Sequence, residues 1–116
     1  MSLQQRYRLA KRADFSRIYR VGKSAANMQF VVYNKMNKHT ERFRVGISAS
    51  KKLGGAVVRN RVRRLVKEAV RLNADKIAAN RDIIVIVRRP VVDMRYKDVE
   101  KCLLHAFRRA GVLEKG

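Results

Sequence analysis

The chain has 116 residues, of which 29 are Lys or Arg and 9 are Asp or Glu, so its formal net charge is +20. Such a charge disfavours a lone compact chain through self-repulsion and favours a polyanionic partner, which points to nucleic acid. A hydrophobic content of 47% is enough for one modest core and excludes a disordered basic tail. No apolar run approaches the ~18 residues of a membrane span and no lipidation motif is visible, so we expect no membrane partner.

No repeat, low-complexity block or proline-rich linker divides the sequence, so we expect one domain over residues 1–116. Residues 1–12 are polar and basic, and we interpret them as an arm that becomes ordered on binding. The single cysteine, Cys102, cannot form an internal disulfide, and no N-terminal apolar segment with a cleavage site is visible. These features predict a cytoplasmic protein.

The first predicted element is a short helix over residues 14–20. Phe15, Ile18 and Tyr19 recur there at helical spacing, and Gly22 follows at the position of a helix cap. This spacing is more often that of core residues than of binding residues.

Strands are predicted next. Residues 28–34 are rich in β-branched and aromatic side chains, residues 42–50 alternate apolar with polar or small ones, and residues 82–87 form an apolar run typical of a buried central strand. The last helix, residues 97–110, has apolar residues at helical spacing and ends before Gly111. This order of elements in a small chain predicts an α+β fold with helices packed against a small mixed sheet.

The most basic segment, residues 51–71, has eight Lys or Arg and one acid, and predicts a helix over residues 56–73. Its apolar stripe comprises Val58, Val62, Leu65, Val66, Ala69 and Leu72. A row of cations at i, i+4 spacing comprises Arg59, Arg63, Lys67 and Arg71. Like charges at this spacing each cost roughly a few tenths of a kcal/mol, so we interpret the row as a phosphate-binding surface and not as an ordinary solvated face.

Residues that could carry catalysis are scarce. The acids are scattered, and none forms the paired pattern on an apolar strand that a metal-dependent nuclease uses. There is no glycine-rich phosphate loop and no serine elbow. Cys102 and His105 lack the further ligands of a zinc site, so we interpret Cys102 as a core residue and His105 as partly exposed. We expect no metal site and no catalysis by the polypeptide alone.

Residues 45–68, VGISASKKLGGAVVRNRVRRLVKE, closely resemble the signature of bacterial ribonuclease P protein subunits, and the A-V-x-R-N core falls on residues 56–60. Residues 12–24 and 29–33, the R-R-P at residues 88–90 and the closing helix also resemble that family. The resemblance implies a ribosomal protein S5 domain 2-like fold, a two-layer α/β sandwich with the order α-β-β-β-α-β-α. It also implies a left-handed βαβ crossover, although about 98% of such crossovers are right-handed.

The family resemblance implies that a catalytic RNA holds the hydrolytic centre, with Mg²⁺ bound mainly by RNA and substrate. The chain would then be a single RNA-binding domain that assists this RNA in endonucleolytic maturation of the tRNA 5′ end. Its implied partners are ribonuclease P RNA and precursor tRNA, and no protein partner is evident. The residues implied to bind the catalytic RNA are Arg59, Asn60, Arg61, Arg63, Arg64, Lys67 and Arg71. The helical wheel places Arg61 away from the main row, and Arg64 could pair with Glu68 at i, i+4.

The resemblance also implies a cleft between the first helix and the sheet that binds the single-stranded 5′ leader of precursor tRNA. Phe15, Tyr19 and Tyr33 match its stacking positions, and base stacking on aromatic rings selects little sequence. Cations that follow predicted strands are assigned to the flanks of the cleft. They are Lys51, Lys52, Arg88 and Arg89.

Three alternatives stay open at this point. A structural RNA-binding protein, such as a small ribosomal protein, shares the size and charge but needs no leader cleft. A DNA-binding module that uses residues 56–73 as a recognition helix would have a helix and tight turn before it, whereas strands and two glycines precede this one. A nuclease with its own active site would cleave RNA without any catalytic RNA.

Overall fold

The structure is a computed structural model and describes residues 12–114, so the predicted basic arm lies almost entirely outside the described residues. Its helices and strands are α1 (Arg12–Val21), β1 (Lys23–Ala26), β2 (Phe30–Met36), β3 (Phe43–Ser48), α2 (Ala56–Leu72), β4 (Arg81–Val87) and α3 (Tyr96–Ala110). Three 3-10 turns connect them, namely η2 (Lys51–Leu53), η3 (Ala74–Lys76) and η4 (Arg89–Asp93). The predicted order α-β-β-β-α-β-α is confirmed.

The four strands form one mixed sheet in the order β1-β2-β4-β3. β1 and β2 pair antiparallel, as do β2 and β4, whereas β3 and β4 are parallel. The predicted central position of β4 is confirmed, because it pairs on both sides and Ile83, Ile84 and Val85 are fully buried. α2 is the crossover between the parallel pair, and its left-handed sense stays a prediction.

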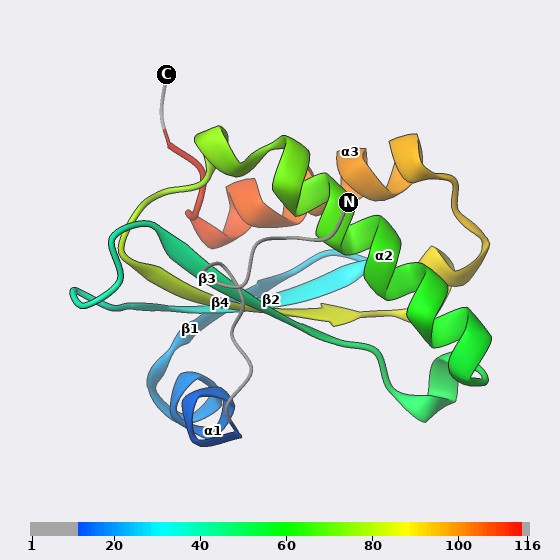
Figure 1. Cartoon of the computed structure of the whole chain (residues 1–116), viewed down its shortest axis with the longest axis horizontal. Coiled ribbons are helices and arrows are strands. Elements are labelled where there is room, and N and C mark those ends of the chain that lie inside the picture. The colour runs from blue at the N-terminus through cyan, green and yellow to red at the C-terminus, as the bar shows by residue number, and fades with distance from the viewer. Residues whose placement is uncertain (1–11, 115–116) are drawn as a thin grey trace.

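The two faces of the sheet are covered unequally. α2 and α3 lie side by side on one face, and α1 alone lies on the other (Figure 1). Because side chains alternate along a strand, Ile83 and Val85 belong to the large core under α2 and α3, whereas Ile84 contacts Ile18 of α1. The predicted helical layer on a small mixed sheet is confirmed, and α1 is an addition on the opposite face.

Glycines end or begin three of the helical segments. Gly111 caps α3 in the left-handed conformation with φ of 74°, as predicted. Gly22 follows α1 for a different reason, because a Cβ there would lie 2.5 Å from the carbonyl oxygen of Ile18 and 2.8 Å from that of Asn34. Gly54, with φ of 141°, separates η2 from α2.

The predicted apolar stripe of α2 is wrong at its C-terminal end. Leu72 is 51% exposed, whereas Val70, which the pattern left out, is fully buried. The buried face is centred on Val66 and Val70, because the helix is rotated on the sheet relative to the wheel drawn from the sequence. No helix in the described part of the chain combines the length and hydropathy needed to span a membrane.

Candidate nucleic-acid interface

The cationic row of α2 runs along the flank that faces β3. Arg63 defines this flank, since its guanidinium donates to the carbonyl of Ala49 just beyond β3 at 3.4 Å and to Asn60 Oδ1 at 3.1 Å. Arg59, Arg63 and Lys67 form no ion pair with any acid among the described side chains, which begin at Phe15, and the Nε of Arg59 is buried without a hydrogen-bond partner. These cations are therefore not neutralised by described acids and can bind phosphates.

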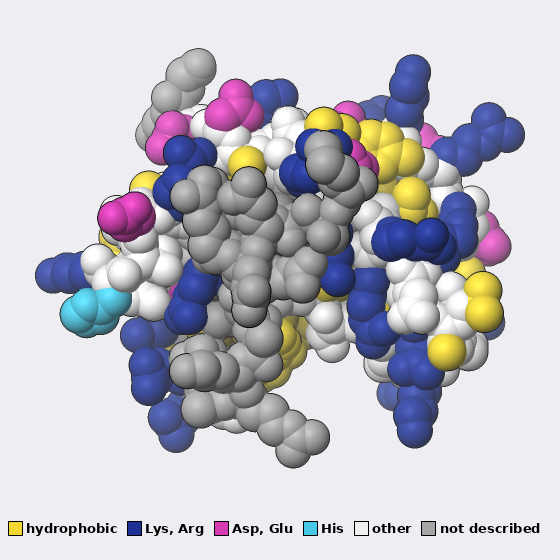
Figure 2. All heavy atoms as spheres, in the orientation of Figure 1, with side chains coloured by type: hydrophobic (Ala, Val, Ile, Leu, Met, Phe, Trp, Pro, Cys, Tyr) yellow, Lys and Arg dark blue, Asp and Glu magenta, His cyan; other side chains and the backbone are white. Residues whose placement is uncertain are grey.

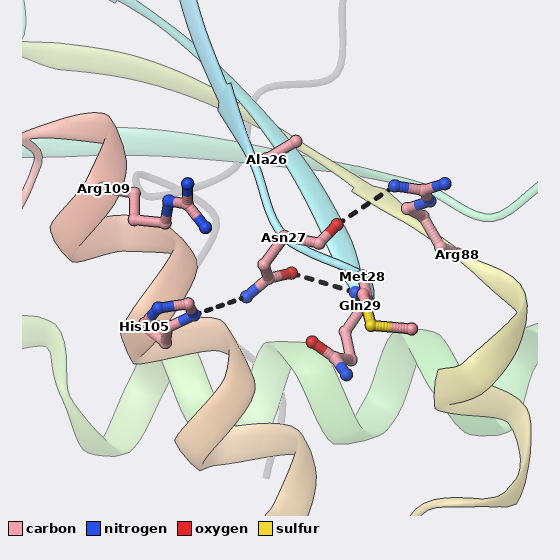
Figure 3. Close-up of a pocket in the computed structure, with 7 residues that line it drawn as sticks. All are labelled: Ala26, Asn27, Met28, Gln29, Arg88, His105 and Arg109. Carbon is pink, nitrogen blue, oxygen red and sulfur yellow. Dashed lines mark hydrogen bonds between the residues drawn. The ribbon is translucent and has the colours of Figure 1, made fainter.

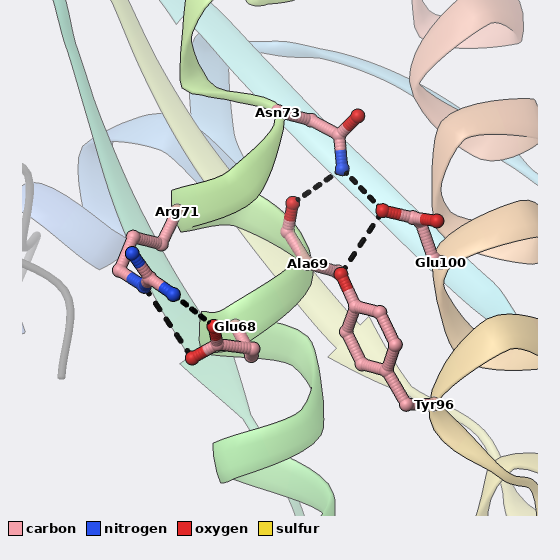
Figure 4. A network of polar contacts seen from close by, with 6 residues as sticks. All are labelled: Glu68, Ala69, Arg71, Asn73, Tyr96 and Glu100. Carbon is pink, nitrogen blue, oxygen red and sulfur yellow. Dashed lines mark hydrogen bonds and ion pairs between the residues drawn. The ribbon is translucent and has the colours of Figure 1, made fainter. Parts of the chain in front are cut away.

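Glu68 pairs with Arg71 and not with Arg64 (Figure 4). The suggested Arg64–Glu68 pair is thus wrong, because the carboxylate turns toward the residue three positions later. Hydrogen bonding to Arg71 lowers the pKa of the Glu68 carboxyl group. Arg64 is left exposed, and Arg71 is the one member of the cationic row whose charge an acid compensates among the described residues.

Arg61 lies on the opposite flank of α2 from Arg63. Its guanidinium donates to the carbonyl oxygens of Val92 at 3.0 Å and Met94 at 2.9 Å, at the end of η4. The structure therefore does not bring Arg61 together with the cationic row, in agreement with the helical wheel. Its hydrogen bonds tie α2 to the connection that leads into α3.

The three predicted stacking residues lie together on the α1 face of the sheet. The ring centroids of Phe15 and Tyr19 are 6.4 Å apart, and those of Tyr19 and Tyr33 are 5.0 Å apart, both in edge-to-face geometry. Phe15 and Tyr33 are half-buried against Ile18 and Ile84, and Tyr19 is 42% exposed. None of the three rings is fully buried, so each has surface free for a partner. We call these three residues the aromatic surface.

Polar groups on the same sheet face surround the aromatic surface. Burial and the neighbouring Tyr33 hydroxyl raise the pKa of Tyr19, while a hydrogen bond with Ser48 acts in the opposite direction. Tyr19 therefore stays protonated at neutral pH. Asp82, the one acid in the four strands, accepts two hydrogen bonds from Arg44, at 2.9 and 2.8 Å. This bidentate pair compensates the negative charge of Asp82, so the carboxylate does not make this face repel anions.

The four cations predicted to flank the cleft divide into two groups. Lys51 and Lys52 are exposed in η2, and Arg89 donates to the carbonyl of Lys52 at 3.1 Å. Arg88 instead donates to the carbonyl of Asn27 in the β1–β2 turn, at 3.1 Å. The structure therefore brings three of these residues together beside the N-terminal end of α2 and places Arg88 at another site.

Sequence reasoning missed the contacts of Asn27, which joins three elements (Figure 3). Its Oδ1 accepts from the backbone N–H of Gln29 and Phe30, and its Nδ2 donates to the carbonyl of Cys102 and to His105 Nδ1. No spacing signal predicts contacts across 75 or more residues of sequence. Cys102 is packed against the main core, where burial raises its pKa, and His105 is exposed.

A polar network between α2 and α3 was also missed. Glu100 accepts hydrogen bonds from Asn73 Nδ2 at 2.8 Å and from the Tyr96 hydroxyl at 3.0 Å (Figure 4). These bonds lower the pKa of Glu100, and burial together with Glu100 raises the pKa of Tyr96 to about 12. The network fixes α2 relative to α3 and so holds the cationic row in place.

No group of three or more His, Cys, Asp or Glu is arranged to hold a metal ion among the side chains that the structure describes, those of residues 15–114. Three of the acids are engaged by other side chains, namely Glu68, Asp82 and Glu100. Figure 2 shows many Lys and Arg side chains projecting from the visible face and few acids. The surface is therefore suited to binding phosphates.

Comparison with known proteins agrees with this geometry. A family model described as Ribonuclease P matches residues 3–111. The ribonuclease P protein component of Bacillus cereus is 41% identical over 112 residues, which cover 97% of this chain and 94% of that protein.

Solved structures give the same result. An RNase P protein structure from Staphylococcus aureus has 47% identity and a TM-score of 0.87, and covers 93% of this chain and 98% of that one. The RNase P protein from Thermotoga maritima, in complex with 1-(4-fluorophenyl)-2-thiourea, has 35% identity and a TM-score of 0.81. That match covers 88% of this chain and 98% of that one. With its matched family model, full-length relatives and shared fold, the chain belongs to the ribonuclease P protein family.

Proposed function

We propose that the chain works as the protein subunit of ribonuclease P, in which it binds the catalytic RNA through α2 and the 5′ leader of precursor tRNA through the aromatic surface. The observation that carries this proposal is the pairing of two features. One is a flank of α2 whose cations Arg59, Arg63 and Lys67 have no acidic partner among the described residues. The other is a set of partly exposed rings on the opposite face of the sheet.

The α2 surface binds RNA by neutralising phosphates. Each phosphate that Lys or Arg neutralises releases a counterion, so affinity falls steeply as the salt concentration rises. Exposed Arg64 extends the cationic row, and Asn60, which accepts from Arg63, orients that guanidinium. Arg71 contributes less to phosphate binding because Glu68 compensates its charge. Arg61 contributes indirectly, because its hydrogen bond to the carbonyl of Val92 holds α2 in position.

The aromatic surface distinguishes precursor from product. A leader base stacked on an aromatic ring is worth about 1–3 kcal/mol, and the mature tRNA lacks the leader that supplies such bases. Because these contacts exist only before cleavage, the precursor binds more tightly than the product, and the product leaves. Stacking on Phe15, Tyr19 and Tyr33 requires no particular base, which suits leaders of differing sequence.

Hydrolysis of the phosphodiester bond belongs to the catalytic RNA. Mg²⁺ in the complex would be held mainly by the catalytic RNA and the substrate. The engagement of Glu68, Asp82 and Glu100 by other side chains supports this assignment, because these three carboxylates are not free to hold a metal. The protein contributes positive charge that offsets the repulsion between two RNA molecules.

A precursor tRNA cleavage assay tests the proposal. A fixed amount of cognate catalytic RNA at modest Mg²⁺ concentration is mixed with precursor tRNA, with and without the protein. We expect the protein to increase cleavage at the mature 5′ end and to cleave nothing without the RNA. No stimulation would contradict the proposal, and RNA-free cleavage abolished by carboxylate replacement would show a nuclease with its own active site.

A further inference from the structure

A hollow of about 480 Å³ lies where the β1–β2 turn and the C-terminal end of β4 meet α3 (Figure 3). Its lining comprises Ala26, Asn27, Met28, Gln29, Arg88, His105 and Arg109. Two of these side chains are guanidinium groups, one is an imidazole and none is acidic. The hollow therefore has the charge expected of an anion site, and its volume suits a small ligand or one nucleotide.

Hydrogen bonds hold the wall of the hollow in place. Because both backbone N–H groups of Gln29 and Phe30 point at Asn27 Oδ1, the amide orientation is fixed and Nδ2 faces His105. An amide nitrogen only donates, so His105 Nδ1 accepts at 3.1 Å and the proton of the neutral ring is on Nε2. That leaves Nε2–H as a donor for a ligand.

Further cations continue from the hollow along α3. Lys97, Lys101 and Arg109 lie in one exposed row with His105, and successive members of this row are four residues apart. No acid in the described part of the chain forms an ion pair with them. Glu100 is held on the side of α3 that faces α2, by Asn73 and Tyr96. Lys97 and Lys101 are like charges at i, i+4 spacing, which destabilises a free helix, so a bound anion would stabilise this one.

The hollow is separate from both surfaces assigned above. The cationic row of α2 faces β3, whereas the hollow lies against β1, and β1 and β3 are the two edges of the sheet. The aromatic surface lies on the α1 face, and α3 covers the opposite face. One RNA segment on the α2 flank would therefore not fill this hollow.

We propose that the hollow binds one nucleotide of a single-stranded RNA segment. Arg88, Arg109 and His105 hold its phosphate, and the side chain of Met28, which is 73% exposed at the rim, contacts its sugar or base. Two features favour single-stranded RNA as the occupant. A hollow of this volume takes a nucleotide and not a duplex. The apolar side chain of Met28 lies beside the cationic Arg88 and Arg109, as a base lies beside its phosphate. This site is an addition to the proposed function and does not depend on it.

The test compares two neighbouring arginines of α3 in the full-length chain. Arg109→Gln removes a cation from the hollow, and Arg108→Gln removes an equal charge from an exposed position that does not line it. A short oligouridylate is titrated into each ¹⁵N-labelled protein. We expect the amide signals of residues 27–29 to shift in wild type and Arg108→Gln, and to shift much less in Arg109→Gln.

Affinity supplies the second measurement. Arg109→Gln should weaken oligouridylate binding about fivefold relative to Arg108→Gln and reduce the slope of log K against log salt by about 0.7. Equal affinities and equal shift patterns for the two variants would overturn the proposal. Uridine monophosphate that binds the hollow as tightly as the oligouridylate would also overturn it, since a free nucleotide and not an RNA strand would then be the ligand.

Two further variants keep this test independent of the leader assignment. With Phe15→Ala and Tyr33→Ala present together, the shifts at residues 27–29 should persist, and their loss would show that the hollow is not a separate site. Met28→Ser should weaken oligouridylate binding while leaving binding of inorganic phosphate unchanged. An unchanged oligouridylate affinity in Met28→Ser would contradict the nucleotide contact.

Discussion

The two faces of the sheet differ in how tightly they are packed. Beneath α2 and α3, a continuous core contains fully buried rings such as Phe30 and Phe107. Beneath α1, the buried apolar side chains among the described residues are Ile18 and Ile84, and the aromatic side chains around them are partly exposed. The first face stabilises the fold and holds the cationic helix at its outer surface, whereas the second leaves rings available to a partner. The difference shows that similar apolar residues serve stability on one face and binding on the other.

The largest effect that sharpens this comparison is expected in the main core. Phe107→Ala should lower the free energy of unfolding by about 3–5 kcal/mol, because it removes a fully buried ring and leaves a cavity. Phe15→Ala is the matched change on the other face and should cost about 1 kcal/mol, because its ring is half-buried. Urea unfolding of both variants measures this. Equal costs would mean that the two faces do not differ.

For binding, in contrast to stability, we expect the larger effects from substitutions on the α1 face of the sheet. Phe15→Ala combined with Tyr33→Ala should weaken precursor tRNA binding by the complex roughly tenfold or more, through the loss of stacking. Mature tRNA binding should change little, because the mature molecule has no leader. Tyr33→Phe, which keeps the ring, is the control and should retain most of the affinity. Equal losses for precursor and mature tRNA would contradict the leader assignment.

The two flanks of α2 provide the next comparison. Arg59→Ala with Arg63→Ala should weaken binding to the catalytic RNA and reduce the salt slope by about 0.9 for each phosphate that is no longer neutralised. Arg61→Ala should leave that slope nearly unchanged but lower the free energy of unfolding by about 1.5 kcal/mol, since its guanidinium hydrogen bonds are internal. Filter binding at several salt concentrations distinguishes the double variant from Arg61→Ala. An unchanged salt slope in the double variant would mean that the cationic row of α2 does not contact the RNA.

The smallest effect concerns the polar network between α2 and α3. Tyr96→Phe removes the hydrogen bond to Glu100 and should cost about 1 kcal/mol at neutral pH. The pKa of Tyr96 is raised from 10.0 to about 12, so its contribution is present below pH 10 and is lost as the pH rises toward 12. The stability of the wild type should therefore fall between these pH values more than that of Tyr96→Phe. Parallel pH profiles would contradict this role.

The same network also makes stability depend on pH in the acidic range. The pKa of Glu100 is lowered by hydrogen bonds from Asn73 and Tyr96, so the stability that it contributes is present above its unfolded pKa and is lost as the pH falls through the folded value. Asn73→Ala should reduce this loss on the acid side, since Asn73 is the main cause of the shift. Unfolding measured from neutral to acidic pH tests the sign.

Local patterns were sufficient to predict most of the fold. The alternation in residues 42–50 and the helical spacing in residues 56–73 reflect side-chain periodicities of two and 3.6 residues, which any amphipathic strand or helix must show. The short strand Lys23–Ala26 was not located by such a pattern, because it has four residues and is mostly exposed. The rotation of α2 on the sheet also escaped prediction, because it depends on packing against other elements.

The site was predicted unevenly for related reasons. The cationic row followed from spacing within one helix, and the three rings matched a family pattern. The separation of Arg88 from Arg89 did not follow, because adjacent residues at a strand end point in different directions and each finds a different carbonyl. The exposed row of α3, which comprises Lys97, Lys101, His105 and Arg109, also has four-residue spacing, but the apolar residues of the same helix dominate its periodicity, so this row was not singled out.

By itself, the sequence determined the charge, every element except β1, and the flank of α2 that carries cations, because these depend on composition and short-range periodicity. Only the tertiary structure decided which arginines are free and which are held by carbonyls or by Glu68, and that Asn27 and His105 meet beside a hollow. These outcomes depend on contacts between residues far apart in the chain. Such contacts are set by how the elements pack, and no local pattern specifies them.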